Sequence, residues 1–284
     1  MDLNRIVEGF MINKFFRKKN KMKQTAHQVL RMLHKKILLK NLNDKIAIYF
    51  HNIEPHFYDI FKESILFFKK SGYRFVFPQT FVSSNDEGKR VFLSFDDNYF
   101  SWYPLLEVLD QLEIKASFFI NTIPIREAAS DKIIGDYFDR LKYAGDQRTL
   151  SKTEIRMLKK RGHNIGDHTH SHFMLTSIPI QKAKEEIKKG KDILEDILGE
   201  EVSDFSFPFG MRRHFNQELR DYASSIGLKT ISNAVSSLQY KTHQMLDINR
   251  TLWDLQKPLC ENITNLQIDG RMFVNLTGRS PLGI

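Results

Sequence analysis

The sequence lacks the features that would cross-link the chain or carry it through a membrane. It has a single cysteine, Cys260, among 284 residues, which excludes an intramolecular disulfide framework. This is typical of a reducing compartment, although many exported bacterial proteins also lack disulfides. No apolar run approaches the length that spans a bilayer, and no apolar h-region with a small-residue cleavage site is present near the N-terminus. We therefore expect a cytoplasmic protein.

The net charge of +9 is concentrated in an N-terminal arm. Residues 1–44 carry eleven Lys or Arg and three acids, whereas the other 240 residues carry 32 and 31. Ala26, Leu30, Leu33 and Ile37 recur at helical spacing, so we predict a basic, partly helical arm. The arm would either contact an anionic membrane at its periphery or pack its apolar side on the rest of the protein. No nucleic-acid-binding motif is present, so no nucleic-acid partner is expected.

Residues 45–284 alternate between strand-like and helix-like segments, without an internal repeat or a low-complexity linker. The whole chain is 41% hydrophobic with 23 Phe, which is ample material for a core. The alternation predicts an α/β domain of parallel βα units that close into a barrel. Strands are predicted at 45–50, 73–77, 91–95, 116–121, 163–167, 202–207, 228–232 and 245–249, and helices at 57–70, 102–112, 151–161, 179–198 and 214–226.

Two adjacent carboxylates follow the central predicted strand. Val91–Phe95 is largely apolar, Asp96 and Asp97 come next, and an apolar run at helical spacing begins at Trp102. Adjacent carboxylates repel one another and do not help a core, while strand ends in α/β folds are where catalytic groups lie. On these residues alone, a helix N-cap Asp beside a solvated partner is an equally good interpretation.

The segment Gly166–His172, with the sequence G-D-H-T-H-S-H, favours the catalytic interpretation. His168 and His172 are four residues apart, so they would share one face if the turn continued as a helix. Histidine runs also occur by chance on surfaces, but this one follows a strand-like segment, as the Asp pair does. One carboxylate and two histidines, with open positions for water and substrate, predict a catalytic metal site.

Three motifs in this order resemble the polysaccharide deacetylase family, the NodB-homology group of carbohydrate esterase family 4. They are S-F-D-D-N, H-T-H-S-H and, at Phe205–Gly210, F-S-F-P-F-G, and the resemblance covers residues 46–252. It implies a distorted (β/α)7 barrel with its site at the C-terminal ends of the strands. The implied reaction is metal-dependent hydrolysis of the N-acetyl group of an amino sugar in a bacterial surface polysaccharide or its precursor.

The resemblance also assigns roles to residues. A divalent metal, with Zn²⁺ favoured, would be bound by Asp97, His168 and His172, and Asp96 would be the general base. His170 fills a variable position in the motif and is interpreted as a bystander.

The chain departs from the family pattern at three positions. Ser206 replaces the Arg that pairs with the base, Phe209 replaces a Tyr, and Asn98 replaces the Gly after the Asp pair. We expect Asn98 to take up the left-handed backbone of that turn. The backbone N–H of Phe209 is predicted to bind the oxyanion. Arg250, which resembles a later strand-end Arg of the family, is the candidate partner of Asp96, with an ordinary surface ion pair as the alternative.

These departures keep other functions open. The lost Arg and the degenerate third motif would suit a carbohydrate-binding protein that has lost turnover. Deformylation of a lipid-linked amino sugar would use the same machinery.

The general acid is predicted to be His51. Most of the family places this His near the C-terminus, but no His follows Arg250. His51 directly follows the first predicted strand, and I-Y-F-H-N-I resembles the poly-N-acetylglucosamine deacetylase branch, whose strand order is circularly permuted. A closed barrel permits this because its first and last strands are neighbours. A His that only caps the strand is the alternative. His56 is near enough to substitute, whereas His214 and His243 do not follow strands.

Overall fold

The computed structural model describes residues 42–83, 88–236 and 246–267. The chain divides into two units, 1–42 and 43–284, and the description below concerns the second. The predicted basic arm, apart from its last three residues, lies outside the described residues, so its contact with a membrane stays a prediction. His243 also lies outside them. No helix within the described ranges is long and apolar enough to cross a membrane.

The strands form one parallel sheet that curls into a nearly closed barrel, as the alternation predicted. The sheet order is β8-β7-β6-β5-β4-β3-β1-β9, and β2 pairs with the start of β3 outside this path. The bounds are β1 Lys45–Phe50, β2 Arg74–Phe75, β3 Arg90–Asp97, β4 Ser117–Ile120, β5 Asn164–Asp167, β6 Asp204–Ser206, β7 Thr230–Asn233, β8 Leu246–Asn249 and β9 Thr251–Leu252.

A single residue, Arg250, separates β8 from β9, which lie at the two ends of the sheet path. If β8 and β9 are counted as one interrupted strand, the ring has seven strands, which confirms the predicted distorted (β/α)7 barrel. β1 lies between β3 and β9, so the first strand of the barrel is the neighbour of the last. The permuted position predicted for His51 requires this arrangement.

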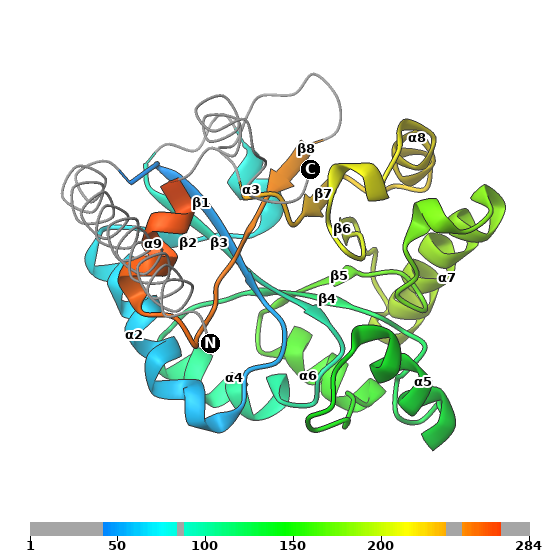
Figure 1. The fold of residues 1–284 in the computed structure, drawn as a ribbon, viewed down its shortest axis with the longest axis horizontal. Helices are drawn as coiled ribbons and strands as arrows, with labels where there is room; N and C mark the ends of the chain where they lie inside the picture. The colour runs from blue at the N-terminus through cyan, green and yellow to red at the C-terminus, as the bar shows by residue number, and fades with distance from the viewer. Residues whose placement is uncertain (1–41, 84–87, 237–245, 268–284) are drawn as a thin grey trace, which may run out of the picture. The chain divides into compact units, whose positions relative to one another are not determined.

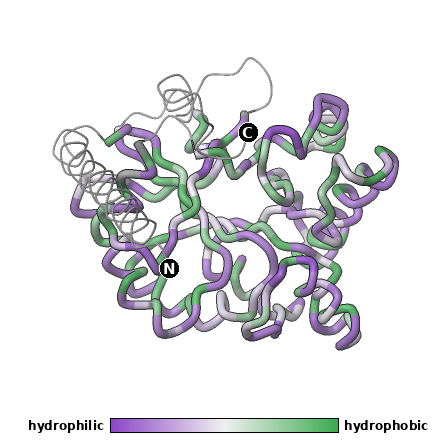
Figure 2. The backbone as a smooth tube through the Cα atoms, in the orientation of Figure 1, coloured by the Kyte–Doolittle hydropathy of each residue, from purple (hydrophilic) through white to green (hydrophobic). Residues whose placement is uncertain are grey.

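Helices surround the strands (Figure 1). Hydrophilic and hydrophobic residues alternate along them, as expected for helices that cover a barrel with one face (Figure 2). Their bounds are α2 Tyr58–Lys70, α3 Pro78–Val82, α4 Trp102–Gln111, α5 Asp131–Leu141, α6 Lys152–Lys160, α7 Ile180–Leu198, α8 Gln217–Ser225 and α9 Leu259–Gln267, with 3₁₀ turns at Pro55–Phe57, Leu175–Ser177 and Arg212–His214.

Capping side chains, a glycine and a proline set where these helices and strands begin and end. Ser151 and Glu154 form a capping box at the start of α6, and Gly199 ends α7 in a left-handed conformation. The predicted strand 73–77 shortens to β2 because Pro78 starts α3. The predicted helix 214–226 begins later, since the Asn216 side chain accepts from a backbone N–H at the start of α8.

Every residue of β3 is buried, as a parallel strand covered on both faces should be. Its Phe95 stacks on Phe118 of β4, with ring centres 4.8 Å apart, and on Phe50 of β1 at 5.6 Å. Each such fully buried Phe contributes about 1.5–3 kcal/mol to the free energy of unfolding. This packing fixes the two carboxylates at the end of β3, on the rim that the C-terminal ends of all the parallel strands share.

Candidate active site

A cavity of about 640 Å³ opens at this rim. Every residue predicted for the site except Arg250 lines it: His51 after β1, Asp96 and Asp97 at the end of β3, His168 and His172 after β5, and Phe209 after β6. Arg250 lies behind this wall and is fully buried. Four strands that are separated in sequence therefore bring the predicted residues into one cleft.

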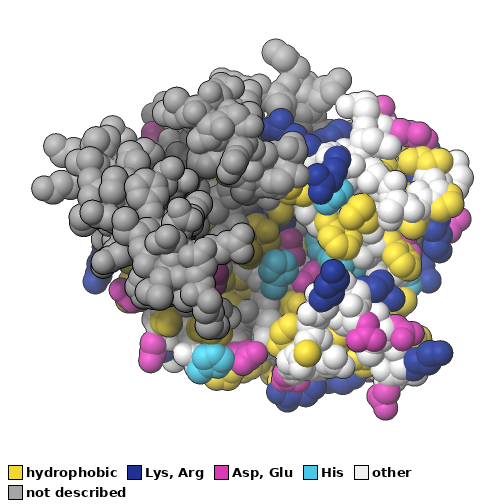
Figure 3. Space-filling model, viewed as in Figure 1, with side chains coloured by type: hydrophobic (Ala, Val, Ile, Leu, Met, Phe, Trp, Pro, Cys, Tyr) yellow, Lys and Arg dark blue, Asp and Glu magenta, His cyan; other side chains and the backbone are white. Residues whose placement is uncertain are grey.

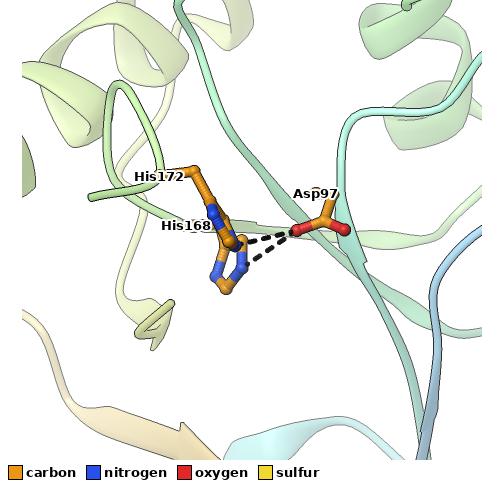
Figure 4. A group of neighbouring side chains, drawn as sticks. All are labelled: Asp97, His168 and His172. Atoms are coloured by element: carbon orange, nitrogen blue, oxygen red, sulfur yellow. Dashed lines mark ion pairs between the residues drawn. The ribbon is translucent and has the colours of Figure 1, made fainter. Parts of the chain in front are cut away.

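Asp97, His168 and His172 converge, and one ligand atom from each lies within 4.8 Å of the others. Asp97 Oδ1 is 3.4 Å from His168 Nε2 and 3.2 Å from His172 Nε2, as the dashed lines in Figure 4 show. All three side chains are buried. A carboxylate and two imidazoles that face one another at these distances are a possible ligand set for a divalent metal.

The hydrogen bonding of this triad tests whether a cation fits. His168 Nδ1 lies 2.6 Å from the Ser206 carbonyl oxygen, which can only accept, so the proton is on Nδ1 and the Nε2 lone pair points at Asp97. Asp97 Oδ1 is buried and has no hydrogen-bond partner among the described residues. Burial lowers the pKa of His172 despite the opposing charge of Asp97, which favours the neutral imidazole that metals bind. The residues therefore fit a divalent cation between them.

The loop that carries the histidines is not the helical turn that their spacing suggested. Thr169 and His172 have positive φ angles of 68° and 59°, so that hypothesis is wrong. Instead, the Asn121 side-chain amide donates to the His168 carbonyl, and the His172 N–H donates to Thr169 Oγ1 at 3.3 Å. Folding back through a left-handed residue lets both imidazoles point at one carboxylate.

Glu186 of α7 holds this loop, although nothing in the motifs indicated it. Its side chain is 2% exposed and accepts from the Ser171 N–H at 2.7 Å and the Ser171 hydroxyl at 3.1 Å. The Glu186 carbonyl accepts from the His170 N–H at 2.9 Å. A charged residue on the apolar face of α7, between Ala183 and Ile187, was the available sequence signal.

Gly190 explains how α7 comes so close to the loop. A Cβ at Gly190 would lie 2.2 Å from Asp167 Oδ1, which a real side chain could not tolerate. That carboxylate is fully buried and accepts from the Thr169 N–H at 2.9 Å. Two buried acidic side chains, those of Asp167 and Glu186, therefore hold the histidine loop by accepting hydrogen bonds from its backbone N–H groups.

Asp96 is paired as the family resemblance suggested. Arg250 Nη1 donates to Asp96 Oδ1 and Nη2 to Oδ2, both at 2.7 Å, so the alternative of an ordinary surface ion pair is wrong. Ser206 donates to Asp96 Oδ2 at 3.1 Å. Burial is the largest single influence and raises the pKa of Asp96, but the charge and hydrogen bonds of Arg250, together with the nearby histidines, outweigh it and leave the pKa below its usual range. Asp96 is therefore ionised at neutral pH.

All five N–H donors of the Arg250 guanidinium have acceptors. Besides Asp96, they are the Asn233 carbonyl at 3.0 Å, Ser94 Oγ at 2.9 Å and Ser206 Oγ at 2.7 Å. The Tyr49 ring covers the guanidinium at 4.7 Å. Ser206 stands where the family has Arg, and its hydroxyl accepts a hydrogen bond from Arg250, which lies between β8 and β9.

His51 lines the same cavity as the two carboxylates. It is partly buried, with its ring edge-on to Tyr49 at 5.4 Å, and its carbonyl accepts from Trp102 Nε1 at 2.9 Å. By contrast, the His56 side chain is 62% exposed and lies 3.4 Å from Glu54. Neither His56 nor His214 lines the cavity.

His170 also stays outside the cavity, with Nδ1 2.8 Å from Thr122 Oγ1. The interpretation of His170 as a bystander agrees with this position.

Two turns at the cleft contain residues with a left-handed backbone. Phe209 and Gly210 both have positive φ, 65° and 61°, and a Cβ at Gly210 would lie 2.5 Å from the Ala234 nitrogen. The expectation that Asn98 takes the left-handed backbone is wrong, because Asp97 does so with φ 90°. The Asn98 side chain instead donates to the Asn121 carbonyl at 3.0 Å and accepts from the Leu150 N–H at 2.8 Å.

Comparison with known proteins gives a family model, a curated relative and several solved structures. The model described as polysaccharide deacetylase matches residues 83–231. A relative from Geobacillus stearothermophilus, described as an uncharacterized 30.6 kDa protein in the fumA 3' region, is 24% identical over 166 residues, which are 58% of this chain and 53% of the relative. The chain thus spans about half the length of the curated relative it matches.

Several solved deacetylase structures share the fold. Streptococcus pyogenes deacetylase PplD, solved with acetate, has a TM-score of 0.62 at 20% identity and covers 78% of this chain and 97% of its own. IcaB from Ammonifex degensii has a TM-score of 0.56 at 17% identity, covering 78% and 95%. The BpsB deacetylase domain from Bordetella bronchiseptica has 0.55 at 13%, covering 74% and 96%.

Proposed function

Because the chain belongs to the polysaccharide deacetylase family, a group of carbohydrate deacetylase hydrolases, we propose that it is a divalent-metal-dependent N-deacetylase. Its substrate would be an N-acetylated amino sugar in a bacterial surface polysaccharide or its precursor. The observation that carries this proposal is the pairing of Asp96 with Arg250 beside the triad of Asp97, His168 and His172 in one cleft. An ionised base next to a cation site is what amide hydrolysis by water needs.

Each residue has a defined task in this proposal. A divalent ion on Asp97, His168 and His172, with Zn²⁺ favoured by the N and O donors, would polarise the acetyl carbonyl and lower the pKa of water to about 7. Asp96 takes a proton as water attacks the carbonyl carbon. The Phe209 N–H donates to the oxyanion. His51 gives a proton to the nitrogen as the C–N bond breaks, which releases acetate and the free amine.

The alternative of a binding protein without turnover rested on the missing family Arg at position 206. Arg250 supplies that charge to Asp96 through a two-fold hydrogen bond, so this departure no longer argues against catalysis. Deformylation would use the same residues and differs only in the acyl group that the cleft accepts. Comparing matched N-formyl and N-acetyl sugars would separate these two reactions.

The first test is release of acetate from N-acetylated oligosaccharides by the purified protein. We expect a chelator to abolish release and Zn²⁺ to restore it. His51→Ala should retain metal and fold but lose about 10²–10⁴-fold in kcat, the usual contribution of a general acid. His56→Ala, an exposed histidine five positions away, is the matched control and should keep the wild-type rate. A His51→Ala variant that deacetylates at the wild-type rate would disprove the assignment.

A further inference from the structure

Two cations lie on the wall of the cleft and have no part in the proposed reaction. Arg140 lies in the last turn of α5 and Lys142 directly follows that helix, and both line the same cavity as His51 and the metal triad. In Figure 3, Lys and Arg side chains border the hollow in which histidine and acidic side chains are visible. Neutral acetamido sugars do not need a positive charge for recognition, so these two residues require an explanation of their own.

Arg140 is held in place but keeps donors available. Its Nε donates to the Ser171 carbonyl at 3.1 Å, and its guanidinium lies 5.3 Å from the centre of the Phe173 ring. Within the described part of the chain, no carboxylate pairs with Arg140 and its two terminal nitrogens have no hydrogen-bond partner. A fixed guanidinium with these nitrogens free is suited to bidentate binding of a carboxylate or phosphate.

Lys142 occupies a backbone position that does not favour lysine. It has φ 54° and ψ 38°, a left-handed conformation in which Gly or Asn is usual after a helix. The next residue fixes this conformation, because the Tyr143 hydroxyl accepts from Asn52 Nδ2 at 2.6 Å and its ring lies 5.1 Å from Tyr99. The exposed Lys142 has no ion-pair partner among the described residues.

The negative groups in the cleft do not cancel these charges. Asp96 is paired with Arg250, and Asp97 faces the proposed cation site. Glu54 lies 3.3 Å from Asn52 Nδ2 and 3.4 Å from the Tyr143 hydroxyl, and its partner His56 is exposed. Arg140 and Lys142 therefore add two positive charges to the lining of the cleft, and neither forms an ion pair with Glu54 among the described residues.

We propose that Arg140 and Lys142 form an anion subsite beside the deacetylation centre, so that the substrate is an anionic glycan. The N-acetylated sugar would have a carboxylate or a phosphate on a neighbouring unit, and Arg140 would bind that group with Lys142 adding charge. This inference rests on the proposed deacetylase function and names its substrate class. A uronic acid and a phosphodiester are the two sources of the same chemistry.

The test compares three N-acetylated oligosaccharides of equal length: a neutral chitooligosaccharide, one alternating with glucuronate and one joined by phosphodiesters. Wild-type kcat/KM should be about tenfold higher for an anionic substrate, and added salt should reduce this preference. Lys142→Gln should lower the anionic-to-neutral ratio about threefold, and Arg140→Gln with Lys142→Gln about tenfold. Lys132→Gln, at the exposed start of α5, is the control and should leave the ratio unchanged.

The outcomes separate the inference from the proposed function. Equal kcat/KM for anionic and neutral substrates, or a double variant that keeps the wild-type ratio, would overturn the anion subsite. Binding of the same three oligosaccharides, measured by calorimetry, provides a readout that needs no turnover. If no substrate is deacetylated but the anionic ones bind more tightly through Arg140 and Lys142, the subsite stands and the deacetylase proposal fails. Equal binding without turnover would reject both.

Discussion

Asp96 and Asp97 are neighbours in sequence and about equally buried, at 4% and 3% exposed, but they differ in the partners of their carboxylates. Asp96 receives two hydrogen bonds from Arg250 and one from Ser206, so its charge is compensated within the chain. Asp97 Oδ1 faces two imidazoles and has no hydrogen-bond partner among the described residues. The charge of Asp96 is thus balanced by groups within the chain, whereas Asp97 and the two imidazoles are placed as the proposed cation site requires.

The largest effect should follow from removing a ligand on the Asp97 side. His168→Ala leaves two of the three ligand groups, so we expect the divalent ion to be lost, and activity to fall about 10³-fold or more with its Lewis-acid contribution. Metal analysis of the purified variants measures occupancy directly. His170→Ala is the matched control, because this side chain faces Thr122 outside the cavity. Unchanged occupancy in His168→Ala would refute the assignment of the triad.

Breaking the Asp96 side should damage stability as well as activity. Arg250→Met leaves a buried carboxylate without its partner, which we expect to cost about 3–5 kcal/mol of unfolding free energy at neutral pH. In the wild type, the lowered pKa of Asp96 stabilises the fold above the carboxyl's unfolded pKa, and this contribution is lost as pH falls through the folded pKa. In the variant, Arg250 no longer offsets the effect of burial, so the pKa of Asp96 rises and lowering the pH should reduce the destabilisation.

Denaturant unfolding of Arg250→Met at several pH values measures this effect, and the acid limb of kcat/KM should move to higher pH. The double variant with Asp96→Asn is the control, because it removes the stranded charge and should recover part of the stability. Equal instability of the single and double variants would contradict the charge-compensation argument.

A smaller effect should come from the support of the histidine loop. Glu186→Gln cannot accept from both Ser171 donors as the carboxylate does, so the loop should lose part of its order. We expect metal affinity to fall about 10- to 100-fold, as is typical when groups that orient metal ligands are changed. Competition with a fluorescent zinc chelator measures it. Glu185→Gln, on the exposed face of the same helix, should bind metal like the wild type.

The smallest effect is expected at Ser206. Ser206→Ala removes the hydrogen bond to Asp96 and the acceptor of one Arg250 N–H, while both hydrogen bonds between Arg250 and Asp96 remain. We expect a loss of about 1 kcal/mol, or about fivefold in kcat/KM. Ser232, its register partner on β7, is a matched control because its buried hydroxyl has no hydrogen-bond partner among the described residues. If Ser232→Ala costs as much as Ser206→Ala, the contact with Asp96 is not the cause.

The sequence predicted the features that short segments determine. Strand periodicity placed Asp96 and His51 at strand ends, and parallel strands necessarily bring such ends to one rim. It could not predict Glu186, whose contact with the histidine loop depends on how closely α7 approaches at Gly190. The helical interpretation of the histidine spacing failed because the loop turns through Thr169 in a left-handed conformation, held by partners distant in sequence.

Arg250 has one more consequence, for the order of folding. It joins β8 to β9, and β9 pairs Thr251 with Ile48 of β1, roughly 200 residues away along the chain. Contacts of such long range are the costliest in loop-closure entropy and are expected to form late. The cation that keeps Asp96 ionised would therefore arrive with the final closure of the ring. A partly folded chain could therefore contain both aspartates and both histidines while Asp96, the proposed base, still lacks Arg250. Deacetylase activity would then appear only when the barrel is complete.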